Sequence, residues 1–306
     1  MPESTKMQFT IIIPTYNRGD IAINTLRVLQ DQSSNNFQVI VVDQSEVIFD
    51  EIKDFRTNSY HYQYLHIDLP SLPNARNVGI ANTDTEFAIF LDDDCIPDAN
   101  IVQSYQAIFN EVEPNTVLIA GRVIEEDSNI FRERADLVGG FVTRYGKTLK
   151  NFDTDRSGFC EWAPGGNFCV RTAAYKEVGG FDLNFIGTAV MEDSDFGYSI
   201  SHLGYEVKYD PRPSMVHLRI PSGGLRQQNP ARAMEYRAHN SVYFFRKHGL
   251  KKYLPLVGAY TLAIAIKEWI KGNYNSSGIY YSFSGFIKGL KTKLRSIEKG
   301  EGPSDG

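Results

Sequence analysis

Three consecutive carboxylates, Asp92 to Asp94, follow the apolar run from Phe87 to Leu91. A short apolar run bounded by polar residues predicts a strand buried on both faces of a sheet, and open α/β sheets bind ligands at the carboxyl ends of such strands. Adjacent carboxylates repel one another unless a cation neutralises them. Their oxygen atoms suit Mg²⁺ or Mn²⁺, which would bridge to a phosphate. The alternative is that two of them cap the following helix and the third is solvated.

Polar residues also follow two other predicted strands. Thr15 to Arg18 come after the strand over 8–14, and Asp43 comes after the strand over 37–42. The ends of parallel strands share one edge of a sheet, so these side chains can line one crevice with the aspartates. The first turn contains neither G-x-G-x-x-G nor G-x-x-x-x-G-K-[ST], which argues against dinucleotide and P-loop binding. Phosphate would therefore be held through a metal ion.

These strands alternate with helices, which predicts an α/β fold with parallel pairing through right-handed crossovers. The expected strands are 8–14, 37–42, 61–67, 87–91, 116–123, 168–171, 206–210 and 215–218. The expected helices are 21–31, 72–81, 98–112, 172–178, 194–203, 231–248, 253–271 and 279–293. We expect residues 125–161 to form an irregular excursion near the site.

Composition favours a globular protein of a reducing compartment. The 306 residues are 42% hydrophobic and 23% charged, which is enough for one large α/β domain and an appendage. The three cysteines, Cys95, Cys160 and Cys169, have no metal-ligand spacing and are expected to be reduced thiols. The polar start over 1–6 does not resemble a secretory signal peptide. We expect a cytoplasmic protein.

The carboxy-terminal part of the chain is basic, although the whole chain carries a net charge of −5. Residues 246–300 contain eleven Lys/Arg and two Asp/Glu. The helices expected there have apolar faces flanked by lysines, which is typical of helices that lie on an anionic membrane surface, here the inner face of the plasma membrane. Lys267 and Glu268 interrupt 253–271, which is also too short for a membrane span. Packing on the domain or homodimer formation is the alternative.

Six short motifs occur in order along the chain. They are I-I-I-P-T-Y-N-R (11–18), V-V-D (41–43), A-R-N (75–77), L-D-D-D (91–94), G-G-F-D (179–182) and E-D-S-D-F-G (192–197). Together they resemble the family 2 inverting glycosyltransferases, whose GT-A fold is a Rossmann-like mixed α/β sheet. The resemblance covers residues 8–220 and implies a GT-A domain over 1–230. Residues 231–306, a basic, amphipathic helical region, lie outside it.

The resemblance implies roles in binding a nucleotide sugar. Thr15, Tyr16 and Arg18 match the loop that contacts the nucleotide. Asp43 matches the residue that accepts a hydrogen bond from the uracil imide, and Arg76 matches a residue near the base and ribose. The alternatives from the residues alone are a surface arginine at 18, a turn cap at 43 and an ion pair at 76.

The same resemblance assigns the aspartates of the DxD motif. Asp92 matches the residue that binds the ribose hydroxyl, Asp94 matches the metal ligand, and Asp93 can share either task. Gly166 belongs to a turn that approaches the donor sugar and acceptor, or is an ordinary turn glycine. His217 matches a histidine that binds the metal or diphosphate, although an isolated histidine is more often structural.

Asp193 matches the catalytic base, and Glu192 and Asp195 are its rivals; a helix N-cap is the alternative for Asp193. Trp162 can stack on a sugar ring or fill the core. Processive relatives carry Gln-x-x-Arg-Trp, whereas 227–232 contains no tryptophan, so addition of one sugar is expected. The expected reaction moves a sugar from a UDP-sugar, with dTDP and GDP left open, to a hydroxyl of a glycan or lipid-linked acceptor. A sugar-phosphate nucleotidyltransferase and a non-catalytic scaffold on a membrane are the alternatives.

Overall fold

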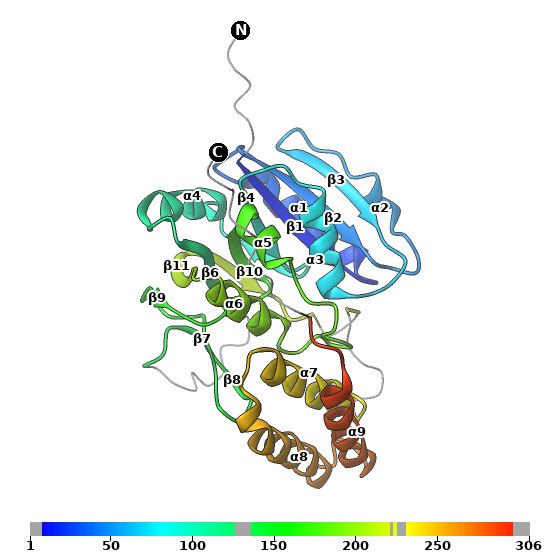
Figure 1. Cartoon of the computed structure of the whole chain (residues 1–306). Coiled ribbons are helices and arrows are strands. Elements are labelled where there is room, and N and C mark those ends of the chain that lie inside the picture. Colours follow the sequence, from blue (N-terminus) through cyan, green and yellow to red (C-terminus); the bar gives the residue numbers. More distant parts are fainter. Residues whose placement is uncertain (1–7, 126–135, 221–222, 225–230, 296–306) are drawn as a thin grey trace.

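The computed structural model describes residues 8–125, 136–220, 223–224 and 231–295 (Figure 1). In these ranges a sheet of nine strands has the order β3-β2-β1-β4-β10-β6-β11-β5, with β9 paired to β11, and β7 and β8 form a separate pair. The strands are β1 (Phe9–Thr15), β2 (Phe37–Asp43), β3 (His61–His66), β4 (Phe87–Leu91), β5 (Cys95–Pro97), β6 (Thr116–Glu125), β7 (Gly139–Val142), β8 (Thr148–Asn151), β9 (Gly158–Phe159), β10 (Asn167–Arg171) and β11 (Glu206–His217). The helices are α1 (Gly19–Val28), α2 (Asp50–Lys53), α3 (Leu72–Ala81), α4 (Ile101–Glu111), α5 (Thr172–Val178), α6 (Glu192–His202), α7 (Ala233–Lys247), α8 (Leu254–Ile270) and α9 (Ser277–Lys291), with short 3₁₀ turns η1 (Leu29–Asp31) and η2 (Lys251–Tyr253).

The parallel pairing predicted from alternating strands and helices is found for β1 to β4. Strand β1 pairs in parallel with β2 and β4, and β2 pairs in parallel with β3, so their carboxyl ends meet at one edge. Strand β10 runs antiparallel to β4 and pairs Asn167 with Leu91. This reversal brings the turn before β10 to the same edge of the sheet, beside Asp92.

Successive side chains of β1 point to opposite faces of the sheet, and both faces are buried. Ile11 packs on one face with Leu26 of α1 and Ile108 of α4. Ile12 packs on the other face with Tyr175 of α5 and with residues of α3 and α6. The sheet is therefore a middle layer between two layers of helices, as an apolar sheet buried on both faces requires.

Two features of the strands were not predicted. Residues 206–217 form one strand, β11, where two were expected, because its pairing with β6 continues past an irregularity. Strand β5 follows the aspartates directly and pairs antiparallel with the end of β11, Cys95 opposite His217. This short strand brings the carboxylate turn to the histidine. Strands β7 to β9 lie in the predicted excursion, of which residues 126–135 lie outside the described ranges.

The three carboxy-terminal helices lie together beside the β7–β8 pair and far from β3, which forms one edge of the sheet (Figure 1). Lys247 of α7 joins them to α6: its Nζ lies 2.9 Å from Asp182 Oδ2 and 2.7 Å from Asp195 Oδ2. His248 Nε2 lies 2.8 Å from the other oxygen of Asp195. The helical region is thus packed on the sheet region through a buried ion cluster. None of the helices in the described ranges has the length and apolar character to cross a membrane.

Candidate active site

The end of β1 and the loop that follows it contact Asp93, the middle carboxylate of the Asp92–Asp94 turn. Thr15 Oγ1 donates a hydrogen bond of 2.7 Å to Asp93 Oδ2, and Arg18 Nη1 lies 3.1 Å from Asp93 Oδ1 and 3.3 Å from Asp94 Oδ2. Arg18 Nη2 also donates to the Ile220 carbonyl at 2.8 Å. Burial raises the pKa of Asp93 to about 7, although Arg18 and Thr15 oppose it. Asp93 therefore anchors the loop through both of its carboxylate oxygens.

A second cluster joins the outer two carboxylates to His217. Ligand atoms of Asp92, Asp94 and His217 all lie within 4.8 Å of one another. His217 Nε2 is 3.2 Å from Asp94 Oδ1 and 4.0 Å from Asp92 Oδ2, while His217 Nδ1 is 3.1 Å from Glu125 Oε2. Glu125 was not predicted; it lies opposite His217 in the β6–β11 register, and its position at a strand end was the available signal.

This cluster fits a divalent metal ion. Two carboxylates and an imidazole form a mixed oxygen and nitrogen donor set that suits a first-row ion such as Mn²⁺. The Glu125 carboxylate fixes the ring of His217 through its other nitrogen, as outer partners of metal-ligating histidines do. Burial alone would lower the pKa of His217, but its bonds to Asp94 and Glu125 and the charge of Asp92 raise it to about 10.

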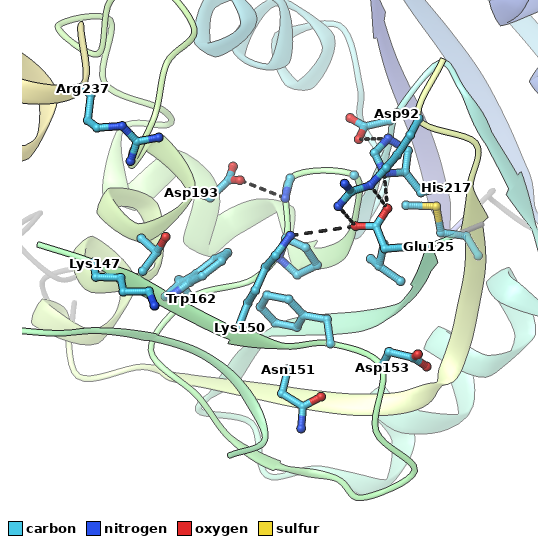
Figure 2. Close-up of a pocket in the computed structure, with 18 of the residues that line it drawn as sticks. Asp92, Glu125, Lys147, Lys150, Asn151, Asp153, Trp162, Asp193, His217 and Arg237 are labelled. Carbon is cyan, nitrogen blue, oxygen red and sulfur yellow. Dashed lines mark hydrogen bonds and ion pairs between the residues drawn. The ribbon is translucent and has the colours of Figure 1, made fainter. Parts of the chain in front are cut away.

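Two cavities meet at this cluster, and Asp92 and His217 line both. The smaller one, about 240 Å³, is also lined by the predicted nucleotide-loop residues Thr15, Tyr16 and Arg18. The larger one, about 770 Å³, opens on the other side of Asp92 and His217 (Figure 2). Its wall includes residues that the sequence did not single out, from β7 to β8 and from α7 and α8, namely Lys147, Lys150, Arg237 and Tyr260.

Asp193, at the start of α6, faces the larger cavity with a side chain that is 23% exposed. Its Oδ2 accepts a hydrogen bond of 3.0 Å from the Gly165 amide, and its Oδ1 lies 3.0 Å from Arg76 Nη1. Glu192 is buried against Arg76, and burial together with the charge of Asp193 holds its pKa well above the usual range. Asp195 is bound in the ion cluster with Lys247. Neither rival carboxylate lines either of these two cavities, so Asp193 is the accessible one of the three here.

Two predicted nucleotide-binding residues are buried. Arg76 lies against Glu192 and Asp193, so it is beside the candidate base. Asp43 is also fully buried: its carboxylate accepts hydrogen bonds from the Ser45 amide at 2.9 Å and from the Tyr64 hydroxyl at 2.8 Å.

Trp162 fills the core, and its place on a cavity wall leaves stacking on a sugar ring as a prediction. The ring is buried and packs edge-on against Phe152, with ring centroids 5.0 Å apart, and it also forms part of the larger cavity wall.

Gly165 and Gly166 are glycines because the backbone passes very close to the carboxylates. A Cβ on Gly165 would lie 2.7 Å from Asp193 Oδ1, and a Cβ on Gly166 would lie 2.7 Å from Asp92 Cγ and closer to its Oδ2. Real Cβ contacts are not this short, so any larger residue must displace the acidic side chain.

Gly166→Ala is therefore expected to move Asp92 and weaken Mn²⁺-dependent binding of a nucleoside diphosphate by about tenfold. This is the lower limit of the loss in metal affinity, about 10–100-fold, that follows when residues contacting the metal ligands are mutated. Calorimetric titration measures the loss. Gly158→Ala is the matched control, because a Cβ there meets only Val138 at 3.4 Å. Equal affinities for the two variants would contradict the tight approach at Gly166.

Asp94→Ala is expected to weaken Mn²⁺-dependent UDP binding by about 10–100-fold or more, since even outer partners of a metal contribute that much. His217→Ala should give the same loss without removing the Arg18 contact of Asp94. Asp93→Asn is the control, because Asp93 contacts Thr15 and Arg18 and should keep the Mn²⁺ dependence. Unchanged Mn²⁺ dependence in Asp94→Ala would reassign the metal to Asp92 or Asp93.

The mixed α/β sheet with helices on both faces is that of the GT-A class, and comparison with solved structures agrees. TarS from S. aureus in complex with UDP-GlcNAc has a TM-score of 0.63 at 14% identity, over 93% of this chain and 82% of that one. The mannosyltransferase PcManGT from Pyrobaculum calidifontis, in complex with GDP-Man and Mn²⁺, has a TM-score of 0.55 at 15% identity, over 94% and 88%. These likenesses show the fold.

The family follows from the sequence match. The model of glycosyl transferase family 2 matches residues 10–178, and the chain belongs to this family. A pre-mycofactocin glycosyltransferase of Mycobacterium tuberculosis is 27% identical over 218 residues, which is 68% of this chain. The chain spans 42% of the length of that relative.

Proposed function

We propose that the protein is a metal-dependent, inverting, non-processive glycosyltransferase. It would move one sugar from a nucleoside-diphosphate sugar to a hydroxyl of a glycan or lipid-linked acceptor. The donor that we propose is a UDP-sugar. The observation that carries this proposal is the shared wall of the two cavities: Asp92 and His217 line both, and Asp193 faces the larger. The ligands of TarS and PcManGT support a nucleotide sugar as donor and differ in the base.

The smaller cavity would take the nucleoside diphosphate. Thr15, Tyr16 and Arg18 would contact it, and Asp92, Asp94 and His217 would hold the metal. A bound divalent ion would supply positive charge to the leaving diphosphate. The hydrogen bonds from Thr15 and Arg18 to Asp93 keep the carboxylate turn in place, so the ligand atoms are oriented before the donor binds.

Asp193 would act as the base in one displacement. Its carboxylate takes the proton of the acceptor hydroxyl while that oxygen forms a bond to the anomeric carbon, and the anomeric C–O bond breaks with its electron pair leaving on the diphosphate. Attack from the face opposite the leaving group inverts the anomeric centre. Arg76 and the Gly165 amide each contact one oxygen of Asp193, so they position the carboxylate.

The test is incubation of the full chain with Mn²⁺ and UDP-, dTDP- or GDP-sugars, followed by NMR of the sugar product at early times. We expect one donor class to release its nucleoside diphosphate, with the anomeric configuration opposite to that of the donor. A retained configuration would contradict the inverting mechanism. Release of pyrophosphate would favour a nucleotidyltransferase, and no release from any donor would favour a scaffold.

We also propose that residues 1–230 form the catalytic domain and that residues 231–306 attach the protein to the anionic inner face of the plasma membrane from the cytoplasm. Large apolar side chains on α8 and α9 support this proposal: Ile270 is 76% exposed and Tyr280 is 69% exposed. Lys271, which follows Ile270, and Lys291, the last residue of α9, are also exposed. Exposed apolar side chains flanked by lysines favour an anionic bilayer surface.

Trp269→Ser combined with Ile270→Ser is expected to lower binding to phosphatidylserine vesicles about tenfold or more, because burying one such side chain contributes roughly 1.5–3 kcal/mol. Co-sedimentation with vesicles measures the loss. Val47→Ser is the control, since Val47 is 81% exposed on the sheet region. Absence of vesicle binding by the unchanged protein would contradict the proposal, and concentration-dependent dimers lost in the double variant would assign these faces to a homodimer.

A further inference from the structure

The larger cavity has a cationic end that the chemistry described above does not use. In Figure 2, Arg237 and Lys147 lie on one side of Asp193, while Asp92, His217 and Glu125 lie on the other. Asp193 is thus between the metal cluster and the two cations. Because the leaving diphosphate must lie at the metal cluster, Arg237 is at the wrong end of the cavity to bind it.

Arg237 has no protein counter-ion in the described part of the chain. Its Nε is buried without a hydrogen-bond partner, and its guanidinium forms no ion pair with a described residue. A guanidinium stays charged at every accessible pH, and a partly buried charge without a partner is costly. An arginine kept in this state on a cavity wall indicates an anion supplied by a ligand.

The carboxylates of the same cavity are already engaged. Glu125 binds His217 and Arg219, and Asp153 binds Arg122. Asp193 accepts from Arg76 and from the Gly165 amide. Among the described residues of this wall, rearrangement therefore gives Arg237 no carboxylate that another cation does not already hold.

We propose that the acceptor carries a carboxylate or phosphate group, and that Arg237, together with Lys147 on the same side of Asp193, binds this group while a hydroxyl of the same acceptor lies at Asp193. This inference rests on the proposed function, whose acceptor it restricts to anionic glycans or phosphate-bearing chains. An arginine binds either group in a bidentate manner. The cavity, at about 770 Å³, is large enough for more than one sugar unit. The carboxy-terminal helices thereby take part in acceptor selection, because Arg237 belongs to α7 and Tyr260 to α8.

Saturation-transfer NMR on the full chain with Mg²⁺ and UDP tests the proposal with two matched pairs of probes. They are methyl β-glucuronide against methyl β-glucoside, and glycerol 3-phosphate against glycerol. We expect the charged member of at least one pair to bind about tenfold more tightly, the typical gain from a charge-assisted hydrogen bond. Arg237→Met should abolish the preference and Arg237→Lys should restore part of it.

Arg232→Met is the matched control, because Arg232 precedes the same helix and does not line the cavity. It should keep the full preference. Equal binding of charged and neutral probes by the unchanged protein, including no detectable binding of either, would overturn the proposal. A preference that survives Arg237→Met would do the same.

The donor is the other source from which a carboxylate could come. The ratio of affinities for UDP-glucuronate and UDP-glucose should be the same in the unchanged protein and in Arg237→Met; a change would place the anion on the donor and overturn the acceptor assignment. Binding of UDP with a metal should also be equal in both. Failure of the unchanged protein to bind UDP or any other nucleoside diphosphate would instead contradict the proposed function, and the probe preference would be judged separately.

Discussion

Asp193→Asn is expected to lower the rate of sugar transfer by about 10²–10⁴-fold, the usual contribution of a positioned general base. Asparagine keeps the shape and can still accept the hydrogen bond of the Gly165 amide, but it cannot take the proton of the acceptor hydroxyl. Affinity for the nucleoside diphosphate should stay unchanged, because Asp193 lines only the larger cavity. Transfer rates and calorimetric titration with the diphosphate measure the two effects.

Asp195→Asn is the matched control, two residues along the same helix. Asp195 contacts Lys247 and His248 and lines no cavity, so this variant should lose stability while its folded fraction keeps its turnover. A large loss of diphosphate affinity in Asp193→Asn would move Asp193 into the donor site. Full activity of Asp193→Asn would exclude it as the base.

Lys247→Met is expected to lower the free energy of unfolding by about 3–5 kcal/mol, the usual cost of removing one partner from a buried ion pair. Methionine keeps the apolar stem of the lysine, whose side chain is 4% exposed. The loss in unfolding free energy would therefore measure the cost of leaving two carboxylates, Asp182 and Asp195, without their shared cation. Urea unfolding measures it, with the exposed Lys271→Met as control.

The same variant has a predicted pH dependence. Burial alone would raise the pKa of Asp182, but Lys247 and other donors lower it below its usual value. The ion pair with Lys247 therefore stabilises the folded protein fully above the unfolded carboxyl pKa, about 3.9, and this contribution is lost as the pH falls through the folded pKa. The difference between Lys247→Met and the unchanged protein should shrink in acid. A difference under 1 kcal/mol at neutral pH would contradict a buried ion cluster.

Most elements of the sheet region could be predicted because their signals are local. The unbroken apolar run before Asp92 predicts β4, and α3 and α5 have the predicted bounds of 72–81 and 172–178. The convergence of strand ends could also be predicted, since parallel pairing places carboxyl ends at one edge. The smaller cavity accordingly brings together Thr15, Arg18 and the aspartates.

The rest depended on contacts between residues far apart in the chain. The partners of Arg76, Glu192 and Asp193, come from α6, more than a hundred residues later in the chain. Glu125 contacts His217 because the register of β6 and β11 places the two residues opposite each other. Arg237 lines the larger cavity from α7, a helix outside the family resemblance. Periodicity describes which face of an element is buried, but it does not say which other element covers that face.

The most direct test of the central claim is calorimetric titration of the protein with UDP, dTDP, GDP and CDP, each with and without Mn²⁺. The cluster of Asp92, Asp94 and His217 at the wall of the smaller cavity predicts that one of these diphosphates binds, and that its affinity depends on Mn²⁺. That result would also identify the donor class. Absence of binding by all four in the presence of Mn²⁺ would contradict a nucleotide-sugar site.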